Sequence, residues 1–571
     1  MGNINHSRMM MDTARTAVCQ TLLSNLKEHV ESQPCVAVLA DKVTIARRTV
    51  DITAIQTLVP NAEPDHIFQT FVVGAPVVKN HDGEALAADI CSTLSEVGVT
   101  NTEKIAAVAA DGQFHHNGVP QKLARLLESS SGCPIPAVWD QAHLMNLAES
   151  DARKHCNSRW VRDTIETVTE VNKMFSIGKG WEDLRRCGED MGEPVLRPKL
   201  WSETRFAAYA AEVFSVFRRN EKQLRAALRR KRMEETRPSH LKELERLLVS
   251  LNDPAFHARV RALEDIYGVL GAASKAVQRT QSLPWERHAD QQEAVETIRR
   301  MKVALVTQHK KSPTTEDLLC LADKDELWPR LSASEPSVPA AEVAKIAFFC
   351  TSIMERLKFR GAGQDVSGSD KNTANNVLGQ SMADLRAVAD LHQLAGSTVP
   401  VPVAARLYRE AGERLVRRKL IPVDTVPTEG EIRSVLPLLR RHREETNQQL
   451  WKMLNRHADD HSARALTNLV TRIWLLSPPE SVVESMGSVI AEVFGEHRQL
   501  EHGNAAKELI VRWNGPSLCR ADRLLSRVHR HLSRDDSFRC VRRTTTIGQS
   551  FHGTVITRHK RAPDHRACLW T

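Results

Sequence analysis

Short apolar segments rich in Val, Ile, Thr and Phe recur between residues 35 and 139, and they limit the fold more than any other feature of the chain. Such segments are typical of buried β-strands, and turn-forming residues separate them here. The pattern predicts three strands, a helix, a strand, a helix and a fifth strand, and therefore a mixed α/β sheet. The expected strands are 35–40, 49–59, 66–78, 105–110 and 136–139, and the expected helices are 83–97, 119–127 and one from His143.

Beyond about residue 155 the apolar spacing becomes helical. No repeat of 20 to 50 residues is present, and apolar periodicity fades from residue 531 onward. At 571 residues the chain is too long for one compact domain, so an all-helical part beside the α/β part is expected. The expected helices are 207–232, 240–251, 259–277, 290–307, 343–357, 383–394, 403–418 and 431–453.

The net charge of +9 comes from the C-terminal segment, because residues 511–571 carry 13 Lys and Arg but only 4 Asp and Glu. Basic clusters attract polyanions, although a solvated helix face also explains a local run such as 218–232. The 11 cysteines include no C-x-x-C pair, which fits a reducing, intracellular compartment. No apolar run approaches the ~18 residues of a membrane span, so no membrane partner is expected.

Two aspartates, Asp41 and Asp111, each follow an expected strand. Carboxylates that converge from neighbouring strand ends, together with a third acid from a helix, can hold the paired divalent cations used in phosphoryl transfer on nucleic acid. Mg²⁺ and Mn²⁺ prefer such oxygen ligands. A strand-end aspartate is more often a cap or turn residue, so this pair alone is weak evidence.

Four segments together resemble the hAT superfamily of transposases. The segments 38–44 (VLADKVT) and 107–112 (AVAADG) are similar to its two Asp-bearing strands. The segment 140–148 (DQAHLMNLA) resembles its C-x-x-H-x-L-N-L motif, and 204–206 (TRF) resembles its T-R-W. A fifth segment, 478–490 (PPESVVESMGSVI), resembles the one that carries the catalytic Glu of the family, which would be Glu484.

The resemblance implies an RNase H-like mixed five-stranded sheet that is interrupted by a large all-helical insertion. The implied catalytic and metal-binding triad is Asp41, Asp111 and Glu484, with Mg²⁺ or Mn²⁺ as the cofactor of a DNA strand-cleaving or strand-transferring enzyme. His143, Arg205 and Phe206 would contact DNA, and the protein would be nuclear and form a homodimer or a higher oligomer. The expected segments are an N-terminal helical segment (1–34), two parts of the core (35–155 and 466–530), the insertion (156–465) and a basic, disordered tail (531–571).

The chain also departs from the family pattern. Asp140 replaces the cysteine of C-x-x-H, Phe206 replaces the tryptophan of T-R-W, and Ser485 replaces the arginine after the catalytic Glu. Residues 1–34 contain no counterpart of the BED-type zinc finger of the family. These departures favour a second hypothesis, a domesticated, non-catalytic nuclear binding or regulatory protein that keeps the fold and the dimer surface.

Other acids and histidines are weaker candidates for the site. Any of Asp51, Asp65 and Asp89 could replace a member of the triad, and His115 and His116 follow Asp111 closely, although a surface loop explains them better. The apolar segment 466–476 fits a dimer surface and packing against the sheet of its own chain equally well.

Overall fold

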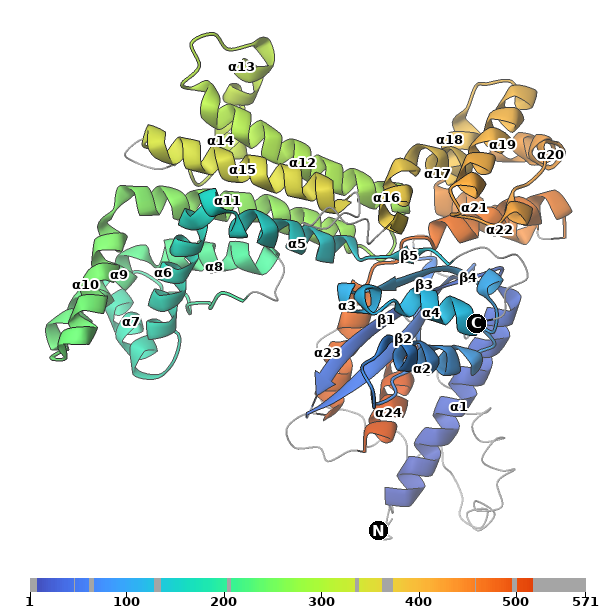
Figure 1. The fold of residues 1–571 in the computed structure, drawn as a ribbon, viewed down its shortest axis with the longest axis horizontal. Coiled ribbons are helices and arrows are strands. Elements are labelled where there is room, and N and C mark those ends of the chain that lie inside the picture. Colours follow the sequence, from blue (N-terminus) through green and yellow to red (C-terminus); the bar gives the residue numbers. More distant parts are fainter. Residues whose placement is uncertain are drawn as a thin grey trace. The chain divides into compact units, whose positions relative to one another are not determined.

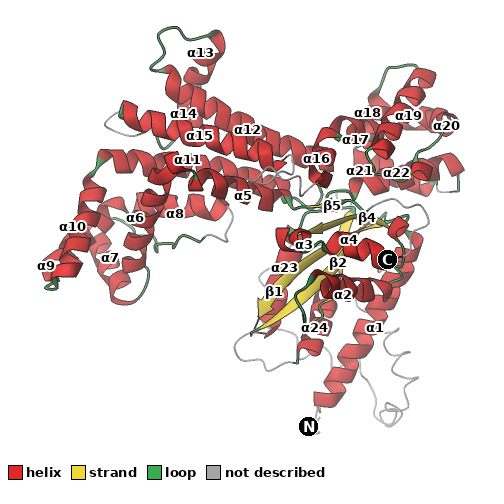
Figure 2. Cartoon of the chain, viewed as in Figure 1, coloured by secondary structure: helices red, strands yellow, loops and turns green. Residues whose placement is uncertain are grey.

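The computed structural model describes residues 8–45, 47–60, 66–127, 135–202, 207–333, 338–361, 373–457, 459–494 and 501–516. The chain divides into two compact units. The sheet unit comprises Met1–Asp140, Thr280–Trp285 and Val377–Thr571, and the helical unit comprises Gln141–Arg279 and Glu286–Asn376. All strands of the described residues belong to the sheet unit (Figures 1 and 2). The tail expected at 531–571 lies outside the described residues.

The sheet unit contains one five-stranded mixed sheet with the strand order β3-β2-β1-β4-β5. β1 pairs antiparallel with β2, and β2 with β3, whereas β1, β4 and β5 run parallel. The expected order of strands and helices is confirmed, except that two helices, Gly112–His116 and Val119–Leu126, replace the one expected between the fourth and fifth strands. The strands are β1 (Val36–Ile45), β2 (Arg48–Leu58), β3 (Phe68–Gly74), β4 (Ile105–Ala110) and β5 (Ala137–Val138).

Helices cover both faces of this sheet. One face carries Val38 and Ala40 of β1 and packs on α2 and α4. The other face carries Leu39 of β1 and packs on α23, α24 and the N-terminal part of α1. The helices around the strands are α1 (Arg8–Ser32), α2 (Gly83–Ser95), α3 (Gly112–His116), α4 (Val119–Leu126), α23 (Ser481–Phe494) and α24 (His502–Asn514), with the 3-10 turn η1 (Thr102–Lys104) before β4.

A second group of helices packs on the sheet through the apolar segment 466–476. Leu469, Val470 and Trp474 are fully buried in one core with Ala37 of β1 and Val138 of β5. Of the two explanations left open for this segment, packing against its own sheet is the one observed. The helices are α16 (Thr373–Gln380), α17 (Met382–Ala389), α18 (Leu391–Gly396), α19 (Val401–Arg417), α20 (Glu429–Arg441), α21 (Asn447–Arg456) and α22 (His461–Trp474), with η3 (Val423–Thr425) between α19 and α20.

Because residues from Val377 onward group with the sheet, the unit limits differ from the segment limits expected at 155/156 and 465/466. The helical unit begins at Gln141 and ends at Asn376. Its helices are α5 (Gln141–Lys154), α6 (Arg159–Phe175), α7 (Gly178–Met191), α8 (Ala207–Arg219), α9 (Glu221–Glu234), α10 (Pro238–Asn252), α11 (Pro254–Val277), α12 (Pro284–Thr307), α13 (Thr315–Ala322), α14 (Lys324–Leu327) and α15 (Ala340–Gly361), with η2 (Cys156–Ser158) before α6.

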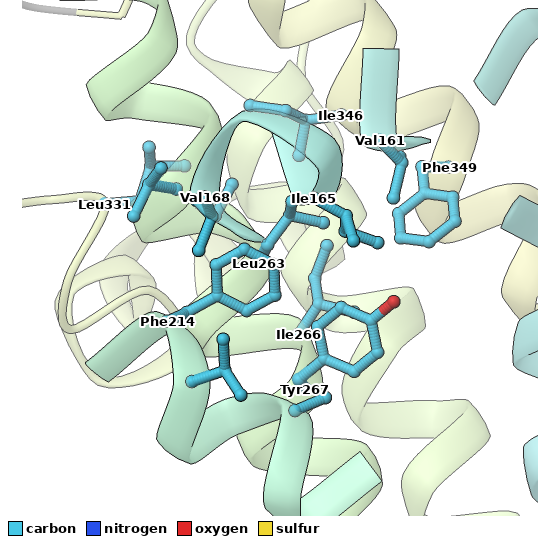
Figure 3. Packing of buried hydrophobic residues seen from close by; sticks show 14 of the residues in the cluster. Val161, Ile165, Val168, Phe214, Leu263, Ile266, Tyr267, Leu331, Ile346 and Phe349 are labelled. Carbon is cyan, nitrogen blue, oxygen red and sulfur yellow. The ribbon is translucent and has the colours of Figure 1, made fainter. Parts of the chain in front are cut away.

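The core of the helical unit is apolar and aromatic (Figure 3). Phe214 of α8 stacks on Tyr267 of α11, with ring centroids 5.6 Å apart. The helix expected at 207–232 is in fact two helices, which separate at Asn220. The amide of Asn220 accepts from the N–H of Leu196 and donates to its carbonyl, so this side chain anchors the preceding segment at the break.

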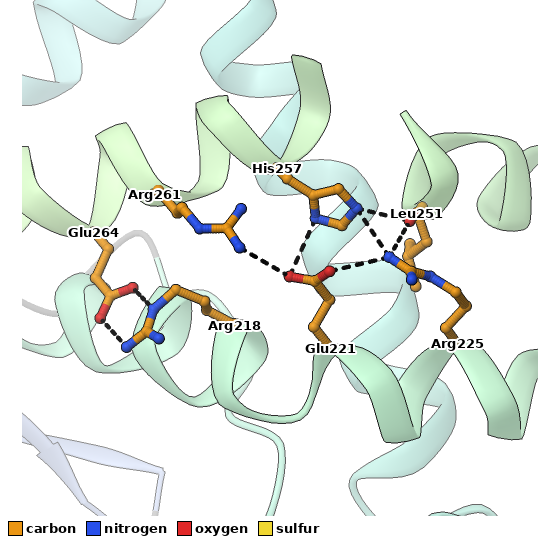
Figure 4. A network of polar contacts seen from close by, with 7 residues as sticks. All are labelled: Arg218, Glu221, Arg225, Leu251, His257, Arg261 and Glu264. Atoms are coloured by element: carbon orange, nitrogen blue, oxygen red, sulfur yellow. Dashed lines mark hydrogen bonds and ion pairs between the residues drawn. The ribbon is translucent and has the colours of Figure 1, made fainter. Parts of the chain in front are cut away.

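Acidic and basic side chains pair around this core (Figure 4). Arg218 donates two hydrogen bonds to Glu264, at 2.5 and 3.1 Å. Glu221 lies within 4 Å of basic groups of Arg225, His257 and Arg261. Much of the basic run at 218–232 is therefore matched by acids of its own unit.

Among the residues that the structure describes, no helix combines the length and the apolar character needed to cross a membrane.

Candidate active site

Asp41 and Asp111 lie side by side on two neighbouring strands, at the point where β4 ends. β1 and β4 are parallel, and Ala40 pairs with Ala110, so the next residue of each chain segment is an aspartate. The expectation that both aspartates follow a strand is correct for Asp111 and wrong for Asp41. β1 continues to Ile45, because β2 pairs with it as far as Ile45 and Arg48, and Asp41 is therefore an internal residue of β1.

The Asp111 side chain also begins the next helix. Its carboxylate accepts from the N–H groups of Gln113 (2.9 Å) and Phe114 (3.2 Å), as an N-cap of α3. Asp41 accepts one hydrogen bond, from the N–H of Lys42 at 2.7 Å. Both N–H groups donate to the same oxygen, Oδ1, and they hold the Asp111 side chain at the end of β4. Asp111 can therefore cap α3 and take part in the site at the same time.

Glu484 is carried toward Asp41 by helix α23, which packs on β1. A Cβ added to Gly487 would lie 2.8 Å from Cγ2 of Val43, so the backbone of α23 approaches the strand closely at this glycine. Val43 and Asp41 are two residues apart and point to the same face of the sheet. Glu484 precedes Gly487 by three residues and shares its face of the helix. The three members of the expected triad therefore converge within the sheet unit.

Two further acids belong to this group, and the sequence analysis did not include them among its site residues. Asp140 follows β5, two residues beyond Val138, just as Asp111 lies two residues beyond Ala109, its partner in the register. Glu480 immediately precedes α23, and its N–H donates to Oδ1 of Asp140 at 3.4 Å. Asp140 and Glu480 are both 6% exposed.

The acids shift one another's pKa values. Burial and the neighbouring Asp111 raise the pKa of Asp41 to about 6. Burial of the Glu484 carboxyl, which keeps part of its surface in solvent, combines with Asp140 and Asp41 to raise its pKa to about 7. The pKa of Glu480 lies well above its ordinary value, because it is buried and faces Asp140, Asp41, Asp111 and Glu484.

The donor set suits a hard divalent cation, since carboxylate oxygens are its preferred ligands and a positive charge would relieve their mutual repulsion. The present side-chain arrangement does not close a coordination sphere. Within the described ranges, no three His, Cys, Asp or Glu side chains are arranged to hold one metal ion.

The opposite face of the same strands holds a buried Lys–Asp pair. Lys42 pairs in register with Asp51, and the Lys42 Nζ lies 4.9 Å from the Phe114 ring centroid. Neither the Lys42 ammonium nor the Asp51 carboxylate has a hydrogen-bond partner. Burial raises the pKa of Asp51 to about 8, although Lys42 lowers it. Since Asp51 and Asp41 point to opposite faces of the sheet, they belong to separate clusters. Asp65 lies outside the described residues.

His115 and His116 lie on the short helix α3 instead of a surface loop. Their rings contact Trp139, with centroids 5.0 and 5.6 Å from it, and Nε2 of His115 is 3.3 Å from the carbonyl oxygen of Val138. Both therefore pack beside the strand end that leads to Asp140.

Of the three residues expected to contact DNA, the structure describes His143. Arg205 and Phe206 lie outside the described residues. His143 is a half-buried residue in the first turn of α5, in the helical unit.

A comparison of the chain with models of protein families finds no match, and a search of curated proteins finds none either.

Proposed function

We propose that the sheet unit is an RNase H-like nuclease core and that the protein is a hAT transposase-like or transposase-derived enzyme that cleaves or transfers DNA strands. One observation carries the proposal: carboxylates from three separate chain segments, Asp41, Asp111 and Glu484, meet at the point where β4 ends. Strand order and directions support the fold, because a sheet of order 3-2-1-4-5 with only β2 antiparallel to its neighbours is the arrangement the resemblance implies.

Asp41, Asp111 and Glu484 would hold Mg²⁺ or Mn²⁺ in this proposal. A bound divalent cation supplies charge stabilisation and lowers the pKa of a bound water or hydroxyl group. The protein itself fixes the carboxylates. The cap on α3 orients Asp111, the paired strand β1 holds Asp41, and the close contact between Gly487 and Val43 sets the distance of Glu484 from the sheet.

The substrate follows from the chemistry of the site and from the charge of the chain. Five carboxylates repel a DNA phosphate unless cations intervene, so basic residues outside the site must attract the backbone. The excess of 13 Lys and Arg over 4 Asp and Glu at residues 511–571 suits this task. DNA as the partner, a nuclear location and homodimers or larger oligomers are part of the proposal.

A second function, a non-catalytic nuclear binding factor with the same fold, is favoured by one observation. Asp140 stands where the family has cysteine, and it adds a negative charge beside Glu484 and Glu480. If this extra charge changes how the site binds cations, the protein would keep the fold of the family but would not cleave DNA.

A Mn²⁺-dependent nicking assay on supercoiled duplex DNA distinguishes the two functions, with the wild-type chain compared with Asp111→Asn. Asn keeps an oxygen that can cap α3 but removes the charge. Cleavage by the wild type that falls to background in the variant supports the nuclease. Equal, background-level cleavage by both proteins would refute it and leave the binding factor.

A further inference from the structure

Glu480 is the most unusual acid of the site. Its side chain is 6% exposed, and its Oε1 is buried without a hydrogen-bond partner. A buried carboxyl that lacks donors loses its hydration and gains nothing in return. Among the described residues, the principal charges that it faces are all acidic, namely those of Asp140, Asp41, Asp111 and Glu484.

The backbone explains how Glu480 is held in this unfavourable place. Its carbonyl oxygen accepts from the N–H groups of Val483 (2.8 Å) and Glu484 (3.1 Å), so it begins the first turn of α23. Its own N–H points to Oδ1 of Asp140. The start of the helix is thereby tied to the segment that follows β5, which fixes the backbone of Glu480 beside Asp140.

We propose that Glu480 is a fourth cation-binding acid of this site and that Asp140 acts with it. The inference rests on the proposed function, because it assumes that a divalent cation binds beside Asp41 and Asp111. A cation there would compensate the orphan oxygen of Glu480 and the charge of Asp140 together. It would also explain why each of the parallel strands β1, β4 and β5 supplies an aspartate here, Asp41 from within β1 and Asp111 and Asp140 from just after β4 and β5.

Calorimetric titration of the full chain with Mn²⁺ alone, at pH 7.5 and without DNA, tests this inference. Glu480→Gln keeps the size of the side chain and removes its charge. Glu492→Gln is the matched control, because Glu492 lies on the same helix and is exposed. We expect Glu480→Gln to bind Mn²⁺ at least about 10-fold more weakly than the wild type, and Glu492→Gln to bind it equally well.

Asp140→Asn provides a second variant in case Glu480→Gln does not fold, since the amide oxygen of Asn still accepts from the Glu480 N–H. It is expected to weaken Mn²⁺ binding and to reduce the rise in melting temperature that Mn²⁺ causes in the wild type. A wild type that binds no Mn²⁺, or variants at both positions that bind it within twofold of the wild type, would overturn the inference.

The outcome of the Mn²⁺ titration can be distinguished from that of the nicking assay. Mn²⁺ binding that depends on Glu480, in a chain that cleaves no DNA, refutes the nuclease and supports the cation-binding role. Cleavage by the wild type together with unchanged Mn²⁺ binding by Glu480→Gln refutes the role of Glu480 and leaves the nuclease in place.

Discussion

Four buried acids, two in each unit, have opposite surroundings. In the helical unit, Glu264 and Glu342 are each held by two hydrogen bonds from an arginine. Burial raises the pKa of Glu342, but the hydrogen bonds and charges of Arg259 and Lys345 together lower it by more. The pKa of Glu342 is therefore below its ordinary value. In the sheet unit, Glu480 and Asp51 have buried oxygens without donors, and their pKa values are raised.

This difference separates buried acids that stabilise the fold from buried acids whose presence is not explained by stability. A paired carboxylate recovers through its hydrogen bonds much of the hydration that it loses. Acids grouped without donors destabilise the ionised protein, and such perturbed groups gather at functional sites. Glu264 and Glu342 thus serve as references for the site. Burial still raises the pKa of Asp265 in the same unit to about 7, although it accepts from the N–H groups of Arg330 and Leu331.

The largest expected effect on activity is in DNA cleavage. Glu484→Gln should lower the rate of Mn²⁺-dependent nicking about 10³-fold, or ~4 kcal/mol, because one of the three cation-binding charges is lost. Glu492→Gln, eight residues further along the same helix, should cleave at the wild-type rate. An equal loss of nicking rate in both variants would mean that any substitution in α23 disturbs the protein. Glu484 would then have no special role in cleavage.

The pH dependence of stability should reveal Asp51. Its pKa is raised to about 8 by burial, so its contribution to stability is complete below about pH 4 and is lost as the pH rises through 8. Between pH 4 and pH 9, Asp51→Asn should therefore gain about 5 kcal/mol in free energy of unfolding relative to the wild type, because the pKa of Asp51 is raised from about 4 to about 8. Urea unfolding at several pH values measures this, with the exposed Glu84→Gln as the control. A difference that does not change with pH would contradict the raised pKa.

Breaking a pair in the helical unit should destabilise the fold. Arg259→Met leaves the buried Glu342 with Lys345 as its remaining cation, and should lower the free energy of unfolding by about 2 kcal/mol. Without divalent cations at pH 7.5, Glu480→Gln should cost nothing or be stabilising, because it removes a buried carboxyl group whose Oε1 accepts no hydrogen bond. A larger loss in Glu480→Gln than in Arg259→Met would reverse the comparison.

The smallest effect is expected from an exposed pair of the helical unit. Arg185 and Glu189 lie 3.4 Å apart, and each side chain is 63% exposed. Glu189→Gln should change the free energy of unfolding by less than about 0.5 kcal/mol, because solvent screens such pairs. Thermal unfolding at low and high salt measures the effect. A loss as large as that in Arg259→Met would show that burial does not determine the strength of these pairs.

The sheet could be predicted from the sequence because its strands are short apolar segments with clear ends. The prediction ended β1 at Ala40, since Asp41 and Lys42 are charged, yet the strand continues to Ile45. Its antiparallel partner β2 determines this, and Lys42 is accommodated opposite Asp51. Pairing across strands is a tertiary effect that apolar spacing in one segment does not contain.

The site could be predicted in part. Asp41, Asp111 and Glu484 were named, and Asp140 was recognised as a departure from the family motif, although it follows β5 as Asp111 follows β4. Glu480 was missed, because the burial of an acid cannot be inferred from its neighbours in sequence. Its position four residues before Glu484, directly ahead of the expected helix, was the available signal. Likewise, Asn220 ends α8 through its hydrogen bonds to Leu196, and helical periodicity continues across that break.

Crystals of the full chain soaked in MnCl₂ would test most directly the claim that these acids form a cation site. The anomalous scattering of manganese locates the ion without reference to activity. We predict a peak with carboxylate oxygens of Asp41 and Asp111 within about 2.5 Å, and with Glu484 turned toward it. Well-ordered carboxylates with no manganese peak beside them would contradict the claim that these acids bind a divalent cation.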